Sequence, residues 1–577
     1  MIDKVEKVPG ALSRRGVLEL AGAAGLVTVL PGRPVFANVD QDRELVVEAT
    51  RLTIDGRESG AIAIGGSVPG PVLRWQEGED VVIRVTNRLP EPTSIHWHGI
   101  LLPGAMDGAP GFNGYIAIPS GETWTYRFQL RQAGTYWYHS HSAMQEQAGM
   151  YGAIIIEPKQ REPVRADRDY VVLLSDHTAD APVSVLRNLK ASSEYYNKGR
   201  RTLVDFFRDV GRNGWSATVD DRLDWGEMRM DPTDLADVTG YDFLVNGKGP
   251  SDNWTGLFEP GERVRLRIIN GSAMSFFDVA IPGLPMTVVA ADGQHVIPVK
   301  VDEFRFGVGE TYDVIVRPTE AKAYTLMAEP LDRSGYARAT LAPKAGMEAP
   351  IPPLRPRATL AMSDMPASHG GHAGHDMAAM DGGGMDHAAM GHDMAGMDHA
   401  AMGHGAAEAT PSSPDAQPVG WDKAGTPAGA KALAYADLKA LKPNADLRAP
   451  SQEIEVNLTG IMERYIWTMN GRKFGDEDVI RVKEGERVRL RFVNDTMMAH
   501  PMHLHGMFME LENGQSERMP KKHVIIVPPG KTVTAVLTAD EVGEWPFHCH
   551  LLYHMASGMM TRFIVEPKGT ELSSVAE

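Results

Sequence analysis

Residues 77–87 read Glu-Gly-Glu-Asp-Val-Val-Ile-Arg-Val-Thr-Asn, a turn followed by alternating apolar and polar residues. Such alternation is typical of a β-strand with one buried face. The pattern returns as Pro-Gly-Glu-Arg-Val-Arg-Leu-Arg-Ile-Ile-Asn at 260–270 and as Glu-Gly-Glu-Arg-Val-Arg-Leu-Arg-Phe-Val-Asn at 484–494. The copies begin 183 and 224 residues apart, which is the spacing of domains and is too long for a solenoid. The sequence therefore predicts an all-β protein of three domains.

At fixed offsets from the repeat, the first and third copies carry pairs of histidines separated by one residue. These pairs are His96 and His98, His139 and His141, His503 and His505, and His548 and His550. The middle copy has Val279, Ile281, Met327 and Glu329 at the equivalent places. Alternate residues of a strand project from the same face, so each pair can share a metal centre. We expect the first and third domains to bind metal and the middle domain to lack ligands.

The histidines outside one Met/His-rich segment are concentrated in these motifs. The chain has 20 histidines, and seven of them lie within residues 362–404. Ten of the remaining thirteen are the four pairs together with His500 and His554. Only His177, His295 and His523 lie elsewhere. Scattered surface or core histidines do not concentrate in this way, which indicates metal binding.

The single cysteine of the chain, Cys549, indicates which metal is bound. It stands between His548 and His550, so its sulfur projects to the opposite face from theirs. There it can meet His500 and His554, with Met559 as a weak axial ligand. Two imidazoles, a thiolate and a thioether form a blue-copper electron-transfer site, whereas structural zinc sites usually employ more cysteines. Copper is therefore favoured over zinc.

Eight histidines remain, which suits three further coppers: a pair of metals taking three imidazoles each and a single copper taking two. The first domain has Thr93 and Ser140 where the third has His500 and Cys549, so it cannot build a second blue site. One-electron donors would meet the blue site, and the cluster would collect the electrons that reduce O2 to water.

The ten histidines with Cys549 and Met559 resemble the full ligand set of the multicopper oxidases, the family of laccases, ascorbate oxidase and bacterial cuprous oxidases. The resemblance spans about residues 44–345 and 446–567. It implies three cupredoxin-like Greek-key β-sandwich domains, with the cluster between the first and third. It also implies that His96 and His503 hold the type 2 copper and that the type 3 pair is held by His98, His139, His141, His505, His548 and His550. The sequences around His139 and Cys549, the paired arginines near the N-terminus and the Met/His-rich insert look most like the copper-resistance protein A group.

An acid beside the cluster is expected, because reducing O2 to water consumes protons. Asp107 matches a family aspartate with that role, which makes it a second candidate catalytic residue beside Cys549. An Asp-Gly pair such as Asp107-Gly108 is equally a common turn, and the sequence leaves both interpretations open. Some relatives have a second acid directly after the last blue-copper histidine, where this chain has Met555.

Patterns outside the repeat predict an export signal and a linker. Ser13-Arg14-Arg15, a modest apolar run and Val35-Phe36-Ala37 resemble a twin-arginine signal peptide over residues 1–37, which implies a periplasmic protein. The predicted domains are 38–160, 165–345 and 446–568, joined by a flexible linker at 346–445. Accessory copper ligands are predicted within that linker at His369, His372, His375, Met377, Met380, Met385, His387, Met390, His392, Met394, Met397, His399, Met402 and His404.

The predicted function is oxidation of Cu(I) to Cu(II) by O2 in copper resistance, with four coppers as cofactors. A laccase acting on phenols or aromatic amines is the alternative enzyme, and a periplasmic copper-sequestering protein without turnover is the alternative of another class. A net charge of −17 argues against a nucleic-acid partner, and no stretch is apolar enough for a membrane span. Other periplasmic copper-handling proteins are candidate partners.

Overall fold

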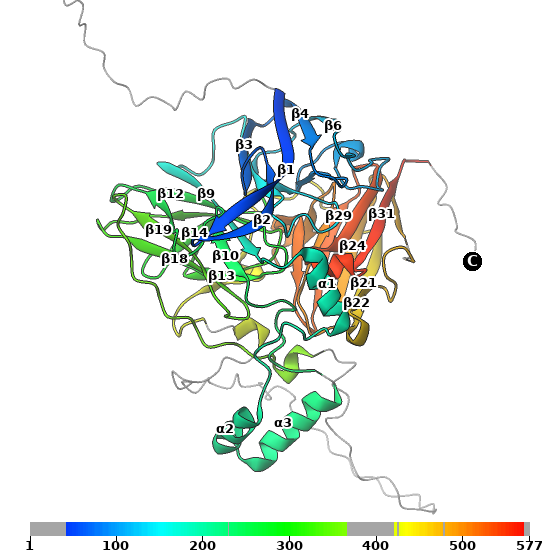
Figure 1. Cartoon of the computed structure of the whole chain (residues 1–577). Coiled ribbons are helices and arrows are strands. Elements are labelled where there is room, and N and C mark those ends of the chain that lie inside the picture. Colours follow the sequence, from blue (N-terminus) through cyan, green and yellow to red (C-terminus); the bar gives the residue numbers. More distant parts are fainter. Residues whose placement is uncertain (1–41, 229, 366–419, 424–425, 477–478, 570–577) are drawn as a thin grey trace, which may run out of the picture. The chain divides into compact units, whose positions relative to one another are not determined.

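The computed structural model describes residues 42–228, 230–365, 420–423, 426–476 and 479–569 (Figure 1). The chain separates into Met1–Asp42 and one compact unit, Arg43–Glu577, to which the following description applies. The predicted signal peptide lies outside the described residues. Among the helices of the described ranges, none is long and apolar enough to cross a membrane.

The first repeat, residues 42–157, forms two four-stranded sheets. One has the order β2-β1-β4-β6, with β1 (Asp42–Ile54), β2 (Arg57–Ile64), β4 (Asp80–Asn87) and β6 (Thr123–Gln129). The other has the order β3-β8-β7-β5, with β3 (Gly70–Gln76), β5 (His96–His98), β7 (Gly134–His139) and β8 (Tyr151–Glu157).

The middle repeat, residues 168–342, also forms two sheets. One has the order β10-β9-β12-β17-β14-β15, with β9 (Arg168–His177), β10 (Asp242–Val245), β12 (Val264–Asn270), β14 (Met286–Ala291), β15 (Gln294–Val301) and β17 (Thr311–Val316). The other has the order β11-β19-β18-β13-β16-β20, with β11 (Trp254–Leu257), β13 (Phe277–Ala280), β16 (Glu303–Phe306), β18 (Tyr324–Pro330), β19 (Ala337–Ala342) and the later β20 (Ala432–Leu433).

The third repeat, residues 452–566, has the same plan. One sheet has the order β22-β21-β24-β29-β26-β27, with β21 (Gln452–Ile461), β22 (Ile466–Met469), β24 (Arg487–Asn494), β26 (Met509–Leu511), β27 (Lys521–Lys522) and β29 (Thr532–Thr538). The other has the order β23-β31-β30-β25-β28, with β23 (Ile480–Lys483), β25 (His500–Leu504), β28 (Val524–Val527), β30 (Gly543–Cys549) and β31 (Met560–Glu566).

The repeated sequence forms an equivalent strand in each repeat: β4, β12 and β24. β12 pairs in parallel with β9 and antiparallel with β17, and β24 pairs in the same way with β21 and β29. Non-sequential neighbours of this kind are typical of Greek-key sandwiches. The predicted fold class, all-β with three cupredoxin-like sandwiches, is confirmed.

The middle copy of the repeat differs from the expectation of a half-buried strand. β4 alternates between buried and more accessible residues, whereas every residue of β12 is buried. Its polar positions are arginines that are neutralised by acids: Arg265 Nη2 lies 2.5 Å from Asp313 Oδ2, and Arg267 Nη2 lies 2.8 Å from Asp169 Oδ2. Buried charges persist when they are paired, which alternation alone does not reveal.

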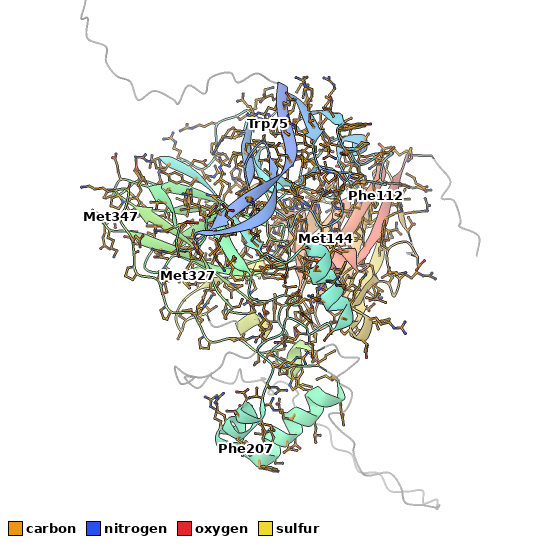
Figure 2. All side chains as sticks on the ribbon, in the orientation of Figure 1. Trp75, Phe112, Met144, Phe207, Met327 and Met347 are labelled. Carbon is orange, nitrogen blue, oxygen red and sulfur yellow. The ribbon has the colours of Figure 1, made fainter. Side chains whose placement is uncertain are left out.

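Three helices interrupt the middle repeat between β9 and β10. They are α1 (Pro182–Ala191), α2 (Leu203–Asn213) and α3 (Trp215–Glu227), and a short α4 (Leu552–Ala556) follows β30. Thr202 caps α2 through a reciprocal capping box with Asp205. Phe207 on α2, labelled in Figure 2, is 65% exposed. Short 3-10 turns occur at Gly104–Met106, Met362–Asp364, Trp421–Lys423, Tyr435–Asp437, Met462–Arg464 and Ser516–Arg518.

The C-terminal end of the segment predicted to be a flexible linker has defined contacts. β20 pairs in parallel with β16, and Tyr435 Oη donates a hydrogen bond of 2.7 Å to Glu310 Oε1. These strand and hydroxyl contacts fix residues that lack the periodic apolar pattern of a core element. The predicted accessory copper ligands, His369 to His404, lie outside the described residues.

Hydrogen bonds and ion pairs join the repeats. Asn113 Nδ2 of the first repeat donates to the carbonyl of Glu544 in the third at 2.7 Å. Arg267 Nη1 of the middle repeat donates to Thr135 Oγ1 of the first at 3.1 Å. The faces of the first and third repeats that carry the histidines can therefore form a shared site.

Candidate metal centres

Two pairs of neighbouring strands place the histidine motifs. In the first repeat β5 pairs with β7, which sets His96 opposite His139. In the third repeat β25 pairs with β30, which sets His503 opposite His548 and Met502 opposite Cys549. Because the two pairings are equivalent, the first and third repeats each carry two His-x-His motifs at equivalent positions on neighbouring strands.

The eight histidines of the four pairs converge on one region between the first and third repeats. Groups whose ligand atoms lie within 4.8 Å of one another are His98, His139 and His550; His141, His505 and His548; and His96, His98 and His503. Within these groups His505 Nε2 lies 3.1 Å from His548 Nε2, and His550 Nε2 lies 3.3 Å from His98 Nδ1. Every three-imidazole group draws on both repeats.

A separate group combines His500, Cys549 and His554, all of which are buried. Cys549 Sγ lies 3.6 Å from His500 Nδ1 and 3.7 Å from His554 Nδ1, and the two nitrogens are 3.1 Å apart. Burial raises the pKa of the Cys549 thiol above its usual range. The proposed axial residue Met559 is also buried, and its carbonyl accepts a hydrogen bond from the Cys549 N–H.

The donor atoms fit copper. The Nε2 atoms of His96, His139 and His503 are buried and have no hydrogen-bond partner among the described residues. Burial, followed by the neighbouring histidines, lowers the pKa of His139 and His503 well below the usual value. Imidazole nitrogens that are buried without a hydrogen-bond partner and lie close to one another are suited to bind a metal cation.

Asp107 contacts ligand candidates from both repeats. Its Oδ2 lies 2.8 Å from His505 Nδ1, its Oδ1 lies 3.3 Å from His96 Nδ1, and its carbonyl oxygen lies 2.9 Å from the same His96 nitrogen. The turn interpretation also holds, since Gly108 has φ of +85° and a Cβ there would lie 1.8 Å from the Ile95 carbonyl oxygen. The turn is what brings the carboxylate to the cluster.

Three further side chains that contact the candidate ligands were not predicted from the sequence. Glu146 Oε2 lies 2.9 Å from His139 Nδ1, Asp237 Oδ2 lies 2.5 Å from His554 Nε2, and His523 Nδ1 lies 3.1 Å from His98 Nε2. Burial raises the pKa of Glu146 well above its usual value. Partners of this kind fix the ring orientation and tautomer of a metal-binding histidine. No local motif marks these residues.

The buried histidines make the stability of the metal-free protein depend on pH. The pKa is lowered, chiefly by burial, for His98, His139, His141, His500, His503, His505, His523, His548 and His550. A pKa that is lower in the folded than in the unfolded chain gives stability that is present above about pH 6.5 and is lost as the pH falls below it. We expect the melting temperature of the metal-free protein to fall steeply between pH 7.5 and pH 5.

Thermal unfolding of the metal-free and copper-loaded proteins across this range is the measurement. The copper-loaded protein should lose less stability, because bound metal holds the imidazoles deprotonated. A metal-free protein with the same melting temperature at pH 5 and pH 7.5 would contradict the burial of these rings as neutral groups.

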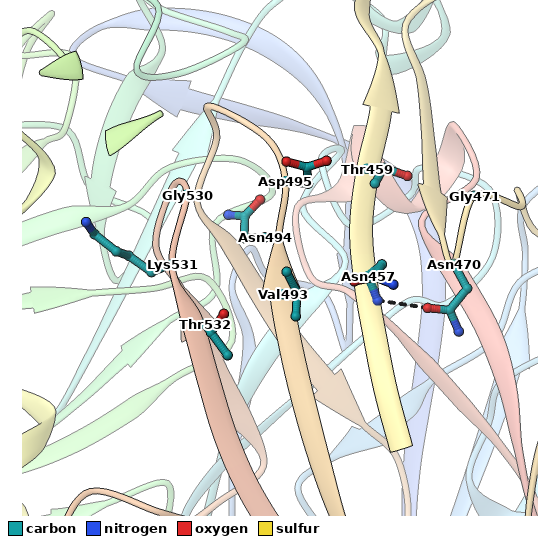
Figure 3. Close-up of a pocket in the computed structure, with 10 residues that line it drawn as sticks. All are labelled: Asn457, Thr459, Asn470, Gly471, Val493, Asn494, Asp495, Gly530, Lys531 and Thr532. Carbon is teal, nitrogen blue, oxygen red and sulfur yellow. Dashed lines mark hydrogen bonds between the residues drawn. The ribbon is translucent and has the colours of Figure 1, made fainter. Parts of the chain in front are cut away.

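A surface pocket of the third repeat is separate from these groups (Figure 3). It is lined by Asn457, Thr459, Asn470, Gly471, Val493, Asn494, Asp495, Gly530, Lys531 and Thr532. The Asn457 N–H donates to Asn470 Oδ1 at 2.8 Å across it. None of the candidate metal ligands lines this pocket.

Comparison with known proteins identifies the family. Family models described as multicopper oxidase match residues 46–161, 168–346 and 448–569. The chain belongs to the multicopper oxidase family. It is therefore an oxidoreductase that uses O2 together with a copper or organic donor, and the family implies four copper ions, one of type 1, one of type 2 and two of type 3, with which the histidine groups agree.

Several relatives of this multicopper oxidase carry the name predicted for its group. The chain is 48% identical to copper resistance protein A of Escherichia coli, over 95% of this chain and 98% of that one. It is 50% identical to copper resistance protein A of Pseudomonas syringae pv. tomato, over 93% and 94% of the two chains. The solved laccase of Botrytis aclada has a TM-score of 0.64 at 22% identity, covering 93% of this chain and 88% of that one, a likeness that shows the fold.

Proposed function

We propose that this multicopper oxidase converts Cu(I) to Cu(II) as part of copper resistance. The relatives named copper resistance protein A support that role. The observation that carries the choice of donor is the buried carboxylate of Asp237 beside His554, described below. The periplasm is the proposed location, reached through the signal at residues 1–37, and periplasmic copper-handling proteins are the proposed partners.

The proposed ligand assignment follows the groups in the structure. The type 1 copper takes His500, Cys549, His554 and Met559, and the type 2 copper takes His96 and His503. One type 3 copper takes His98, His139 and His550, and the other takes His141, His505 and His548. The three domains are proposed at 38–160, 165–345 and 446–568, with the linker at 346–445 supplying accessory ligands.

Copper, when bound, supplies one-electron redox chemistry, at a single centre for the donor and at a three-copper centre for O2. The chain links the two sites covalently, because Cys549 is the immediate neighbour of His548 and His550. All three side chains are buried, so water is excluded along this connection. Asp107 holds the Nδ1 atoms of His96 and His505, which directs their Nε2 atoms toward the metal site.

A buried carboxylate contacts the Nε2 atom of His554. Asp237 Oδ2 lies 2.5 Å from His554 Nε2 and accepts a hydrogen bond of 2.8 Å from Tyr465 Oη. Burial raises the pKa of the nearby Asp234 well above its usual value, as do the negative charges of Asp237, Glu194 and Asp231, while Arg357 opposes them. The carboxylate of Asp237 beside His554 favours a cationic donor over a neutral phenol.

Four methionines lie close to these residues in the sequence. Met228 and Met230 precede Asp231 in the chain, Met462 precedes Tyr465, and Met555 follows His554; all four are partly buried against the core that contains Cys549. Thioethers are soft ligands that favour Cu(I). Carboxylates and thioethers together therefore support Cu(I) as the electron donor.

Oxygen-uptake kinetics with Cu(I) and with a simple phenol test this function. We expect a higher kcat/KM for Cu(I). Replacing Asp237 by asparagine should lower kcat/KM for Cu(I) about 10–100-fold, since the substitution removes the charge beside His554. The amide oxygen can still accept from His554 Nε2, so the orientation of the ring is kept. The control, Asp224→Asn, removes the same charge from an exposed position on α3 and should leave both rates unchanged. A higher kcat/KM for the phenol that is unchanged in the Asp237→Asn variant would indicate a laccase. Copper binding without oxygen uptake would indicate a copper-sequestering protein.

A further inference from the structure

His523 lies outside the four histidine motifs, yet it contacts ligand candidates from two repeats. Its Nδ1 atom lies 3.1 Å from Nε2 of His98 in the first repeat. Its backbone carbonyl oxygen lies 2.7 Å from Nδ1 of His503 in the third repeat. The residue is 1% exposed. One residue therefore touches a proposed type 3 ligand with its side chain and a proposed type 2 ligand with its main chain.

The contact with His98 has a defined direction. His98 Nδ1 faces His550 Nε2 at 3.3 Å inside the group of His98, His139 and His550. A lone pair at Nδ1 leaves the proton of a neutral imidazole on Nε2, which then donates to His523 Nδ1. Asp292 Oδ2 lies 3.7 Å from the same His523 nitrogen, which is too far for a hydrogen bond. His523 thus acts as the acceptor that makes His98 present Nδ1 to the metal site.

The middle repeat, which carries no ligand, fixes His523 in place. The backbone N–H groups of His523 and Val524 both donate to Asp292 Oδ2 at 3.1 Å. Lys522 Nζ lies 3.1 Å from the same oxygen and 2.8 Å from Glu310 Oε1. The side chains of Lys522, Asp292 and Glu310 are fully buried, so this ion-paired anchor is shielded from solvent.

We propose that His523 is a positioning residue of the three-copper site. Its imidazole orients His98 and its carbonyl orients His503, and the middle repeat sets the geometry of the cluster through Asp292. The inference rests on the ligand assignment made above under the proposed function. It gives the ligand-free repeat a part in the cluster, through contacts between residues that lie far apart in the sequence.

Replacing His523 by leucine and by asparagine in the copper-loaded enzyme separates orientation from packing. Leucine fills the space without an acceptor, whereas asparagine can place its Oδ1 near the position of Nδ1. His523→Leu should weaken copper retention about 10–100-fold in competition with a copper chelator. It should also produce an additional copper signal in electron paramagnetic resonance as the coupled pair loosens, while the blue absorbance stays. His523→Asn should restore most of the retention and the parent spectrum.

A matched control and a second variant keep the test decisive. Phe508 packs with its ring centroid 5.8 Å from that of His523 and makes no polar contact with it, so Phe508→Leu should retain copper like the parent. If His523→Leu does not fold, His523→Gln takes its place, because the longer side chain puts its amide near Nε2 and leaves His98 without an acceptor. Copper retention and resonance spectra that match the parent in the leucine or glutamine variant would overturn the proposal, as would an asparagine variant no better than these. A parent enzyme that binds no cluster copper would instead overturn the ligand assignment.

Discussion

Replacing Cys549 by serine should abolish the blue absorbance and steady-state oxygen consumption while leaving the protein folded. Cys549 is the only cysteine of the chain, and its sulfur lies 3.6 and 3.7 Å from the two imidazole nitrogens of its group. A serine hydroxyl nearly conserves volume in this buried position but lacks the soft thiolate on which a blue-copper site depends. Visible absorption, circular dichroism and oxygen uptake, measured on the same preparation, give the three readouts.

Met502 provides the matched control for this substitution. It lies directly opposite Cys549 in the pairing of β25 with β30 and is equally buried, but it is not one of the proposed copper ligands. Met502→Leu should keep the colour and the oxidase rate, since the exchange nearly conserves volume. A Cys549→Ser protein that remains intensely blue would refute the type 1 assignment.

The sequence predicts those features of the fold that are encoded locally. The strands β4, β12 and β24 could be located because each follows a turn and alternates over a short stretch. The burial of β12 on both faces could not, because it depends on partners such as Asp169 and Asp313 that lie far away in the chain. The helices α2 and α3 could not be predicted from the repeat, because the first and third copies contain no counterpart of the segment between β9 and β10.

The same distinction applies to the site. The histidine groups could be predicted because His-x-His spacing on a strand fixes the common direction of two side chains. Glu146, Asp237 and His523 could not, since each meets its ligand only after separate segments have packed together. His523 is 425 residues from His98, and Asp237 is 317 residues from His554. Of the supporting groups only Asp107 had a local signal, and that signal was equally compatible with a turn.

Replacing Asp107 by asparagine should slow oxygen turnover about 10²–10⁴-fold, the range for loss of a positioned acid or base. Asp107 Oδ2 accepts from His505 Nδ1 at 2.8 Å, and the backbone carbonyl of Asp107 accepts from His96 Nδ1 at 2.9 Å. Asp107 Oδ1 lies 3.3 Å from the same His96 nitrogen. An asparagine Oδ1 can still accept from His505 Nδ1, but its NH2 group then lies near His96 Nδ1, and the charge that favours proton delivery is lost. Asparagine still tolerates the turn before Gly108, so the fold should be unchanged.

Single-turnover measurements locate the defect, because reduction of the blue site by the donor should proceed at the parent rate while its reoxidation by O2 slows. Asp80→Asn serves as the control, since it removes the same charge from an exposed position at the start of β4 in the same repeat. Its oxygen turnover should equal that of the parent. If a fully copper-loaded Asp107→Asn enzyme also consumed O2 at the parent rate, the carboxylate would not be required. Asp107 would then serve only as the turn residue that precedes Gly108, and protons would have to reach the cluster by another group, of which Glu146 beside His139 is the nearest buried acid named above.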